Sequence, residues 1–202
     1  MKEYIVFDFE TTGTDPLKDV VTQIAAIHIK DGKQIGSYNK YIKIDREVPE
    51  KITAITGITN KFLNEKGISE RAAWVGFSIF IGKNKLLGHN CINFDRLFLN
   101  FFFNKYGLDM PHHDQYYDTA VVYKARKLNI VRGSGETFYD AAIRVMSIRA
   151  YGVKFNLSLA CKELKIDVSH LEAHRADADV QMTNLLYQFL LAEKIKLNNI
   201  KK

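Results

Sequence analysis

The chain has 202 residues, of which 47% are hydrophobic and 26% charged, values typical of one globular domain and not of a disordered or fibrous protein. It contains no apolar run of the roughly 18 residues that a membrane span needs, and acidic side chains interrupt residues 1–10 where a signal peptide would be apolar. We therefore expect a cytoplasmic protein with no membrane contact. Lysine and arginine outnumber aspartate and glutamate by 29 to 23, which favours a polyanionic partner.

Three predicted strands open the chain. Residues 3–9 and 20–30 are rich in β-branched and aromatic side chains, and residues 34–44 resume the same pattern. The pair Asp31-Gly32, between the second and third runs, is a strong signal for a hairpin. These residues predict a three-stranded antiparallel meander.

Helices and two short strands follow in alternation. Residues 86–88 and 116–117 are too short for helices and predict buried strands. Strands first, then alternating helices and strands, indicate a mixed α/β layer fold with a five-stranded sheet. Helical spacing and terminal residues predict helices over 49–57, 69–81, 94–106, 118–128, 136–148 and 175–196, with a short helix from Asn156.

A pair of carboxylates stands at the end of the first predicted strand. Asp8 and Glu10 are separated by one residue, so the two-residue period of a strand points both side chains to one face. Neighbouring carboxylates repel unless they are solvated, protonated or bound to a cation. Taken alone, the pair fits both an exposed acidic strand end and a site for a hard divalent cation such as Mg²⁺.

Two later segments place polar residues at element boundaries. Asp95 stands where a strand meets a helix, so it either caps the helix or projects over the end of the sheet. His174 precedes the last helix, and Asp179 lies in its first turns, where Asp177 complements the helix dipole. An exposed loop histidine is the plain alternative for His174.

Together these segments resemble the motifs of the DnaQ-like DEDDh family of 3′→5′ exonucleases, which includes the proofreading exonucleases of bacterial replicases. Motif order and spacing both match, and the resemblance covers most of residues 3–192. The tyrosine subgroup of the family would need Tyr at position 175, where this chain has Arg175. The three motifs read Asp8-Phe9-Glu10-Thr11-Thr12-Gly13, Asn90-x-x-x-Phe94-Asp95 and His174-x-x-x-x-Asp179.

The resemblance implies an RNase H-like fold and hydrolysis with two Mg²⁺ or Mn²⁺ ions. By this resemblance, Asp8 bridges both ions. Glu10 and Asp179 complete the site of the attacking water, and Asp95 holds the second ion.

The same resemblance assigns a base and three substrate contacts. His174 would take the proton from the attacking water, a task suited to an imidazole. The backbone of Thr11 and Thr12, together with the side chain of Asn90, would approach the terminal nucleotide.

Two features depart from the family pattern. His89 precedes Asp95 by six positions, where many relatives have five. Residues 129–155 are longer than the usual connection, so we expect one exonuclease domain over residues 1–202 with an insertion there. Basic residues of this segment either meet phosphates or form a solvated helix face.

The implied function is removal of nucleotides from the 3′ end of single-stranded DNA, with release of nucleoside 5′-monophosphates, by a free-standing or polymerase-associated enzyme. DNA is favoured over RNA, but an exoribonuclease needs the same residues and stays open. A non-catalytic nucleic-acid-binding scaffold would have lost acidic residues that are all in place here. A zinc hydrolase is not favoured because we find no histidine or cysteine at zinc spacing, and the distant Cys91 and Cys161 predict reduced thiols.

Overall fold

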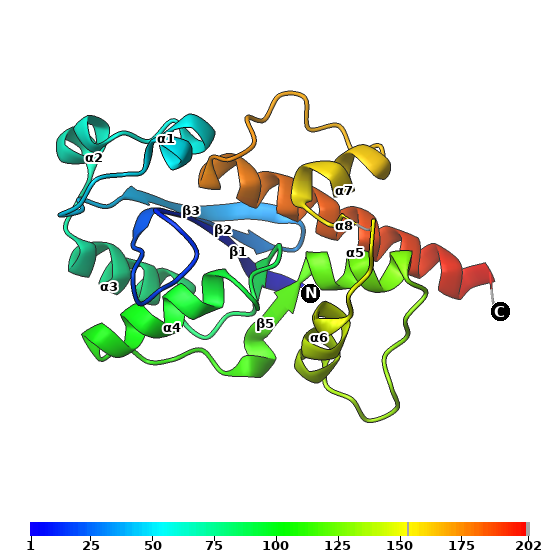
Figure 1. The fold of residues 1–202 in the computed structure, drawn as a ribbon. Coiled ribbons are helices and arrows are strands. Elements are labelled where there is room, and N and C mark those ends of the chain that lie inside the picture. Colours follow the sequence, from blue (N-terminus) through cyan, green and yellow to red (C-terminus); the bar gives the residue numbers. More distant parts are fainter. Residues whose placement is uncertain (153, 201–202) are drawn as a thin grey trace.

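The computed structural model describes residues 1–152 and 154–200, with side chains as far as Glu193. Its centre is a five-stranded sheet with the strand order β3-β2-β1-β4-β5 (Figure 1). The first three strands form the expected antiparallel meander, and β4 and β5 run parallel to β1. The strands are β1 (Glu3–Thr11), β2 (Val21–Lys30), β3 (Lys33–Tyr41), β4 (Leu86–Gly88) and β5 (Tyr116–Asp118).

Helices cover both faces of this sheet (Figure 1). The odd-numbered residues of β1, such as Ile5 and Phe7, lie in one core cluster with α3 (Glu70–Ile81) and α4 (Asp95–Tyr106). The even-numbered Tyr4 and Val6 lie in a second cluster with α8 (Ala176–Ile200). The alternation of a strand thus divides the core into two layers.

Shorter helices complete the molecule. The expected helices near residues 49–57, 118–128 and 136–148 are found with ends shifted by one or two residues, as is usual at helix termini. These helices and turns are α1 (Glu50–Thr56), α2 (Asn60–Lys66), the 3₁₀ turn η1 (His113–Gln115), α5 (Thr119–Lys127), α6 (Phe138–Ser147) and α7 (Leu157–Glu163).

Two expectations about the segment after β2 were wrong. The third strand ends at Tyr41 and not at residue 44, because Ile42 leaves the sheet ladder and forms an isolated parallel bridge with Ile68. Helix α2 was not predicted. It begins after Thr59, whose side chain accepts a hydrogen bond from the N–H of Phe62. Threonine is a favourable residue for such an N-cap.

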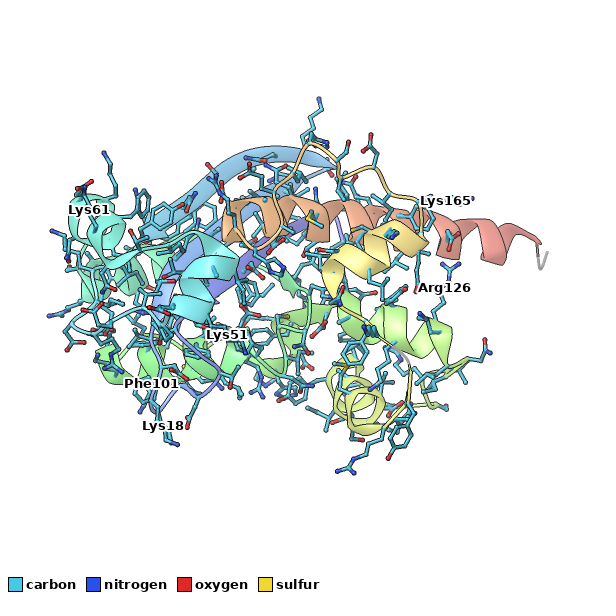
Figure 2. All side chains as sticks on the ribbon, turned by 45° about the horizontal axis from the view of Figure 1, so that its top comes forward. Lys18, Lys51, Lys61, Phe101, Arg126 and Lys165 are labelled. Carbon is cyan, nitrogen blue, oxygen red and sulfur yellow. The ribbon has the colours of Figure 1, made fainter. Side chains whose placement is uncertain are left out.

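Two features noted in the sequence, the basic side chains and the two cysteines, can be located in the structure. Figure 2 shows Lys61 on α2 at one end of the molecule and Arg126 on α5 toward the other. Cys91 and Cys161 are buried free thiols. Within the described residues, no helix combines the length and hydrophobicity needed to cross a membrane.

Candidate active site

The end of β1 presents Asp8 and Glu10 on the face that α8 covers. Tyr4 and Val6 pack against α8, and the two-residue repeat of the strand continues that row through both acids. Both carboxylates are half-buried. Phe9 between them is buried in the core on the opposite face. The strand therefore carries an acidic end on one face and an apolar end on the other.

Asp95 reaches the same strand from the side. The parallel ladder between β1 and β4 stops at the pair Val6–Leu87, which leaves the next stretch of β1 without a strand neighbour on that edge. Asp95, at the start of α4, occupies this position. Its Oδ1 accepts a hydrogen bond of 3.0 Å from the N–H of Phe9, and the residue is only 2% exposed. One carboxylate oxygen is thus used to complete the sheet edge, and the side chain is held beside Asp8.

Asp179 comes from the opposite layer. Ala176 and Val180 pack the start of α8 onto the sheet, and Asp179 lies between them in sequence. One ligand atom from each of Asp8, Glu10 and Asp179 lies within 4.8 Å of the others. Two elements more than 160 residues apart in the chain therefore bring three of the four predicted metal ligands into one cluster, and Asp95 adjoins it.

This crowding of acids changes their protonation. Burial raises the pKa of Asp8 well above its usual range, and the charges of Asp95, Asp179 and Glu10 add to the effect. Burial, with the charges of Asp179 and Asp177, raises the pKa of Glu10 to about 8. Burial also raises the pKa of Asp179 to about 6, and it raises that of Asp95 against the opposing bond from Phe9. Without a counter-charge, the cluster retains protons near neutral pH.

The chemistry of the cluster fits a hard divalent cation. All of its donor atoms are carboxylate oxygens, which Mg²⁺ and Mn²⁺ prefer over softer ligands. The raised pKa values of Asp8 and Glu10 show that the protein environment disfavours their charges, and a bound cation would reverse this. An exposed, solvated acidic strand end would not have these properties.

The loop between β4 and α4 is fixed by a buried acid that the sequence analysis did not assign to the site. Asp118 is fully buried, and its two carboxylate oxygens accept N–H bonds from Asn90 at 2.8 Å, Ile92 at 3.1 Å and Ala120 at 2.9 Å. The bond from Ala120 is the expected helix cap. The other two bonds hold the loop that leads to Asp95. They depend on β4 and β5 being neighbours, which no local pattern reveals.

The three predicted substrate contacts differ in backbone conformation and in their hydrogen bonds. Asn90 has a positive φ of 63°, a conformation that asparagine tolerates better than most residues. Thr11 Oγ1 donates to the carbonyl of Gly13, and the N–H of Thr12 donates to the carbonyl of Val20. Both threonines therefore shape the loop after β1.

His174 is exposed, and its backbone is tied to the cluster. Its φ is 66°, and its N–H donates a hydrogen bond of 3.1 Å to Oδ2 of Asp179. The main chain thus helps to orient one predicted metal ligand, while the imidazole remains on the surface. Asp177, expected only to complement the helix dipole, also pairs with Arg175 at 3.2 Å and accepts a bond from Gln23.

Comparison with known proteins gives the family. The sequence model of the family RNase_T, described as exonuclease, matches residues 5–187. The PolC-type DNA polymerase III of Thermotoga petrophila is 37% identical over 123 residues, 60% of this chain and 9% of that protein. The 3′-5′ exonuclease DinG of Bacillus subtilis is 29% identical over 196 residues, 96% of this chain and 18% of that protein. This chain therefore spans less than a fifth of the length of either relative.

Solved structures show the same fold. A zinc-bound complex of Escherichia coli exonuclease I with single-stranded DNA superposes with a TM-score of 0.75 at 24% identity, covering 99% of this chain and 42% of that one. Exonuclease I from Methylocaldum szegediense gives a TM-score of 0.73 at 22% identity, covering 99% and 42%. The mixed sheet is thus of the RNase H-like type, as expected. With the family match over most of its length, the chain belongs to the RNase_T exonuclease family, the DnaQ-like group of 3′→5′ exonucleases.

Proposed function

We propose that this chain hydrolyses the terminal phosphodiester bond at the 3′ end of single-stranded DNA, releases nucleoside 5′-monophosphates, and uses two Mg²⁺ or Mn²⁺ ions. The observation that carries the proposal is the cluster of Asp8, Glu10 and Asp179, with Asp95 beside it. Its raised pKa values and all-oxygen donors suit a pair of hard cations. The names of the relatives support the polarity, and the DNA complexes of exonuclease I support the substrate.

Each residue of the cluster has a role that its position supports. Two divalent ions at such a site activate the attacking water and offset charge on the phosphate and the leaving 3′-oxygen. The charges of both Asp95 and Asp179 raise the pKa of Asp8, and this suits Asp8 as a ligand that both ions would share. Glu10 and Asp179 would then hold the ion that activates the attacking water, and Asp95 would help to hold the other ion.

The proton and the terminal nucleotide are assigned to the residues around the cluster. We assign the proton of the attacking water to the imidazole of His174, which is exposed and connected to Asp179 through its own N–H. We assign the terminal nucleotide to Asn90, whose N–H is held by Asp118, and to Thr11 and Thr12, which directly follow Glu10 in the chain.

The domain organisation and the partner belong to the same proposal. Residues 1–202 act as one exonuclease domain, and residues 129–155 are an insertion in it. Matching segments occur within far longer relatives, including DNA polymerases, and this supports a polymerase or another nucleic-acid enzyme as a partner.

The test is a time course with single-stranded DNA and RNA of matched sequence, each labelled at its 5′ end. Mg²⁺, Mn²⁺ and EDTA are compared, and the released nucleotides are separated by chromatography against 5′- and 3′-monophosphate standards. We expect a ladder that shortens from the 3′ end only with metal, runs faster on DNA, and gives 5′-monophosphates.

The controls separate the alternatives. An Asp8→Asn variant must lose the ladder, and a substrate blocked by a 3′-phosphate reports on the need for a free end. Faster shortening of RNA would make the chain an exoribonuclease. Retained binding of either strand by wild type, without hydrolysis under any metal, would overturn the proposal in favour of a non-catalytic scaffold.

A further inference from the structure

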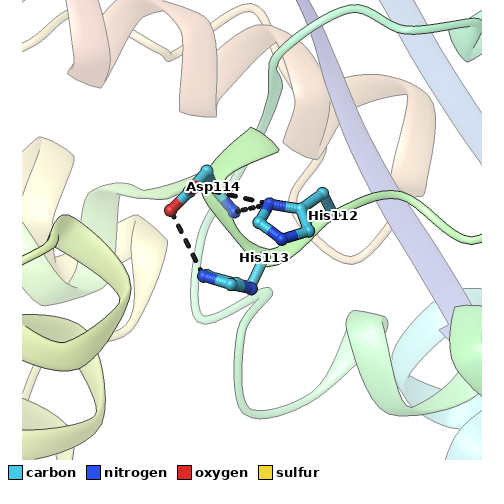
Figure 3. A group of neighbouring side chains, drawn as sticks. All are labelled: His112, His113 and Asp114. Carbon is cyan, nitrogen blue, oxygen red and sulfur yellow. Dashed lines mark hydrogen bonds and ion pairs between the residues drawn. The ribbon is translucent and has the colours of Figure 1, made fainter.

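A second group of metal-binding side chains lies far from the carboxylate cluster in the sequence, at the turn η1. His112, His113 and Asp114 each offer a ligand atom, and these atoms lie within 4.8 Å of one another. Nδ1 of His112 and Nε2 of His113 are each 3.4 Å from an oxygen of the Asp114 carboxylate. In Figure 3, dashed lines join Asp114 to both histidine rings. The three residues are consecutive, so they match no motif of spaced zinc ligands in the sequence.

The separations between the donor atoms match the coordination shell of a small cation. A tetrahedral site with bonds of 2.0–2.2 Å places its donors about 3.3–3.5 Å apart. A direct N–H···O hydrogen bond is shorter, about 2.7–3.2 Å. Each imidazole nitrogen lies 3.4 Å from a different oxygen of the Asp114 carboxylate, which is within this range, so small side-chain rotations would bring all three groups onto one cation. Water would complete the shell because all three residues are exposed.

The backbone of the turn is already fixed. The N–H of His112 donates to Gln115 Oε1 at 2.7 Å, and the amide of Gln115 donates to the carbonyl of Asn84. Lys85 donates to the carbonyl of Asp114. These bonds attach η1 to the segment before β4, so the three ligands need only side-chain rotation to close on an ion.

The ring of His113 also has a neighbour that limits its motion. Its centroid lies 5.3 Å from that of Tyr139 on α6, and the two histidine rings lie 3.9 Å apart. The N–H of Asp114 donates to Nδ1 of His112 at 3.4 Å, a long bond that a cation can replace at small cost.

We propose that His112, His113 and Asp114 form a surface site for Zn²⁺ or a similar borderline transition-metal ion, separate from the carboxylate cluster. Two imidazoles and one carboxylate select zinc, copper or nickel, whereas the all-oxygen set at Asp8 selects magnesium or manganese. The two sites therefore differ in metal preference. An ion at this site would hold η1 closed immediately before β5, whose last residue, Asp118, fixes the loop of the active site.

The experiment is calorimetric titration of ZnCl₂ into protein without a polyhistidine tag, in excess Mg²⁺ and on an Asp8→Asn background, so that binding of Zn²⁺ at the carboxylate cluster is weakened. We expect one Zn²⁺ to bind. A His112→Gln/His113→Gln double variant should lose this binding, and the matched control His170→Gln, at an exposed histidine outside the turn, should retain it. Imidazole ¹⁵N shifts of His112 and His113 on adding Zn²⁺ give a second measurement.

Equal binding of Zn²⁺ by the double variant, or no binding by the parent protein, would overturn the site. Circular dichroism of the double variant confirms that loss of binding is not loss of folding. The outcome is independent of the proposed nuclease function, because zinc binding with no hydrolysis refutes only the latter, and hydrolysis with no zinc binding refutes only the former.

Discussion

At the scale of single residues, the carboxylate cluster opposes the stability of the metal-free protein. We predict that Asp8→Asn abolishes hydrolysis and yet stabilises the metal-free fold, because the raised pKa of Asp8 makes proton uptake part of the cost of folding at neutral pH and asparagine needs no proton. A gain of about 1 kcal/mol would raise the Tm by roughly 2–4 °C for a domain of this size. Thermal unfolding in EDTA measures the shift, and the gel assay measures activity.

The control for this prediction is an exposed acid outside the cluster. Asp45→Asn, at a surface residue that pairs with the neighbouring Arg46, should leave both Tm and activity almost unchanged. An Asp8→Asn protein that unfolds more easily than wild type in EDTA would show that Asp8 is a structural residue.

His174 permits a sharper comparison because its backbone and its ring have separate tasks. We predict that His174→Ala and His174→Asn both slow turnover by roughly 10²–10⁴-fold, the usual effect of a lost general base. Asparagine tolerates a positive φ better than alanine, so His174→Asn should keep the bond from position 174 to Asp179 and hence the metal affinity.

The measurements are the turnover rate and Mn²⁺ binding by calorimetry. Loss of Mn²⁺ binding in His174→Asn would mean that the ring supports the metal site and not the proton transfer. If His170→Ala slows the reaction and His174→Asn does not, the base has been assigned to the wrong histidine.

At the scale of elements, the loop between β4 and α4 depends on Asp118. We predict that Asp118→Asn lowers the free energy of unfolding by about 1–3 kcal/mol, because its amide group would face an N–H where a carboxylate oxygen now accepts. Activity should fall as well, since Asn90 lies on the released loop and Asp95 directly follows it as the first residue of α4. Urea unfolding measures the stability. Asp140→Asn, at an exposed acid in the first turn of α6, is the matched control and should cost less.

The same comparison of elements shows what sequence alone could predict. The sequence predicted a feature correctly where a few neighbouring residues determine it. Examples are the helix starts at Ser69 and Asn156 and the even-numbered face of β1. The bridge between Ile42 and Ile68 and the bonds of Asp118 to the β4–α4 loop join segments that are distant in the chain. They depend on the strand order, and no spacing of residues encodes it.

The predicted site follows the same division. The motif spacing named the acids, and the two-residue period placed Asp8 and Glu10 on one face. The sequence could not show that the pairing of β1 with β4 ends at Val6 and Leu87. This end of the ladder allows Asp95 to accept a hydrogen bond from the N–H of Phe9. The sequence also could not show that the His174 backbone contacts Asp179, because both features arise from tertiary packing.

At the scale of the whole molecule, the 129–155 segment is joined to the active-site loop. Nζ of the buried Lys124 donates to the carbonyls of Met146 and Ile148 at the end of α6, and it lies 4.8 Å from the centroid of the Phe155 ring. His89, next to Asn90, donates through Nε2 to the carbonyl of Phe155 at 2.7 Å. The proposed insertion is therefore attached to both α5 and the loop before Asp95, and it is not an independent appendage.

The pH dependence of stability is the last property of the whole molecule that the cluster determines. Glu10 has a pKa of about 8 in the folded protein, against about 4.3 when unfolded. Between these values the folded state binds more protons than the unfolded state, so stability falls as pH rises through this window. Asp179, with a pKa of about 6, acts in the same direction over a narrower range. We predict that the metal-free protein loses stability from pH about 5 to about 9.

A divalent cation should reverse this trend. It binds the deprotonated carboxylates and only in the folded state, so its stabilising effect grows as pH rises, and binding below about pH 8 releases protons. Urea unfolding in EDTA and in Mn²⁺ across the window measures the first effect, and calorimetry in buffers of different ionisation enthalpy counts the protons. Parallel pH profiles with and without Mn²⁺ would mean that the cation does not bind at Glu10 and Asp179. The Asp45→Asn variant should reproduce the wild-type profiles, because its carboxylate lies outside the cluster.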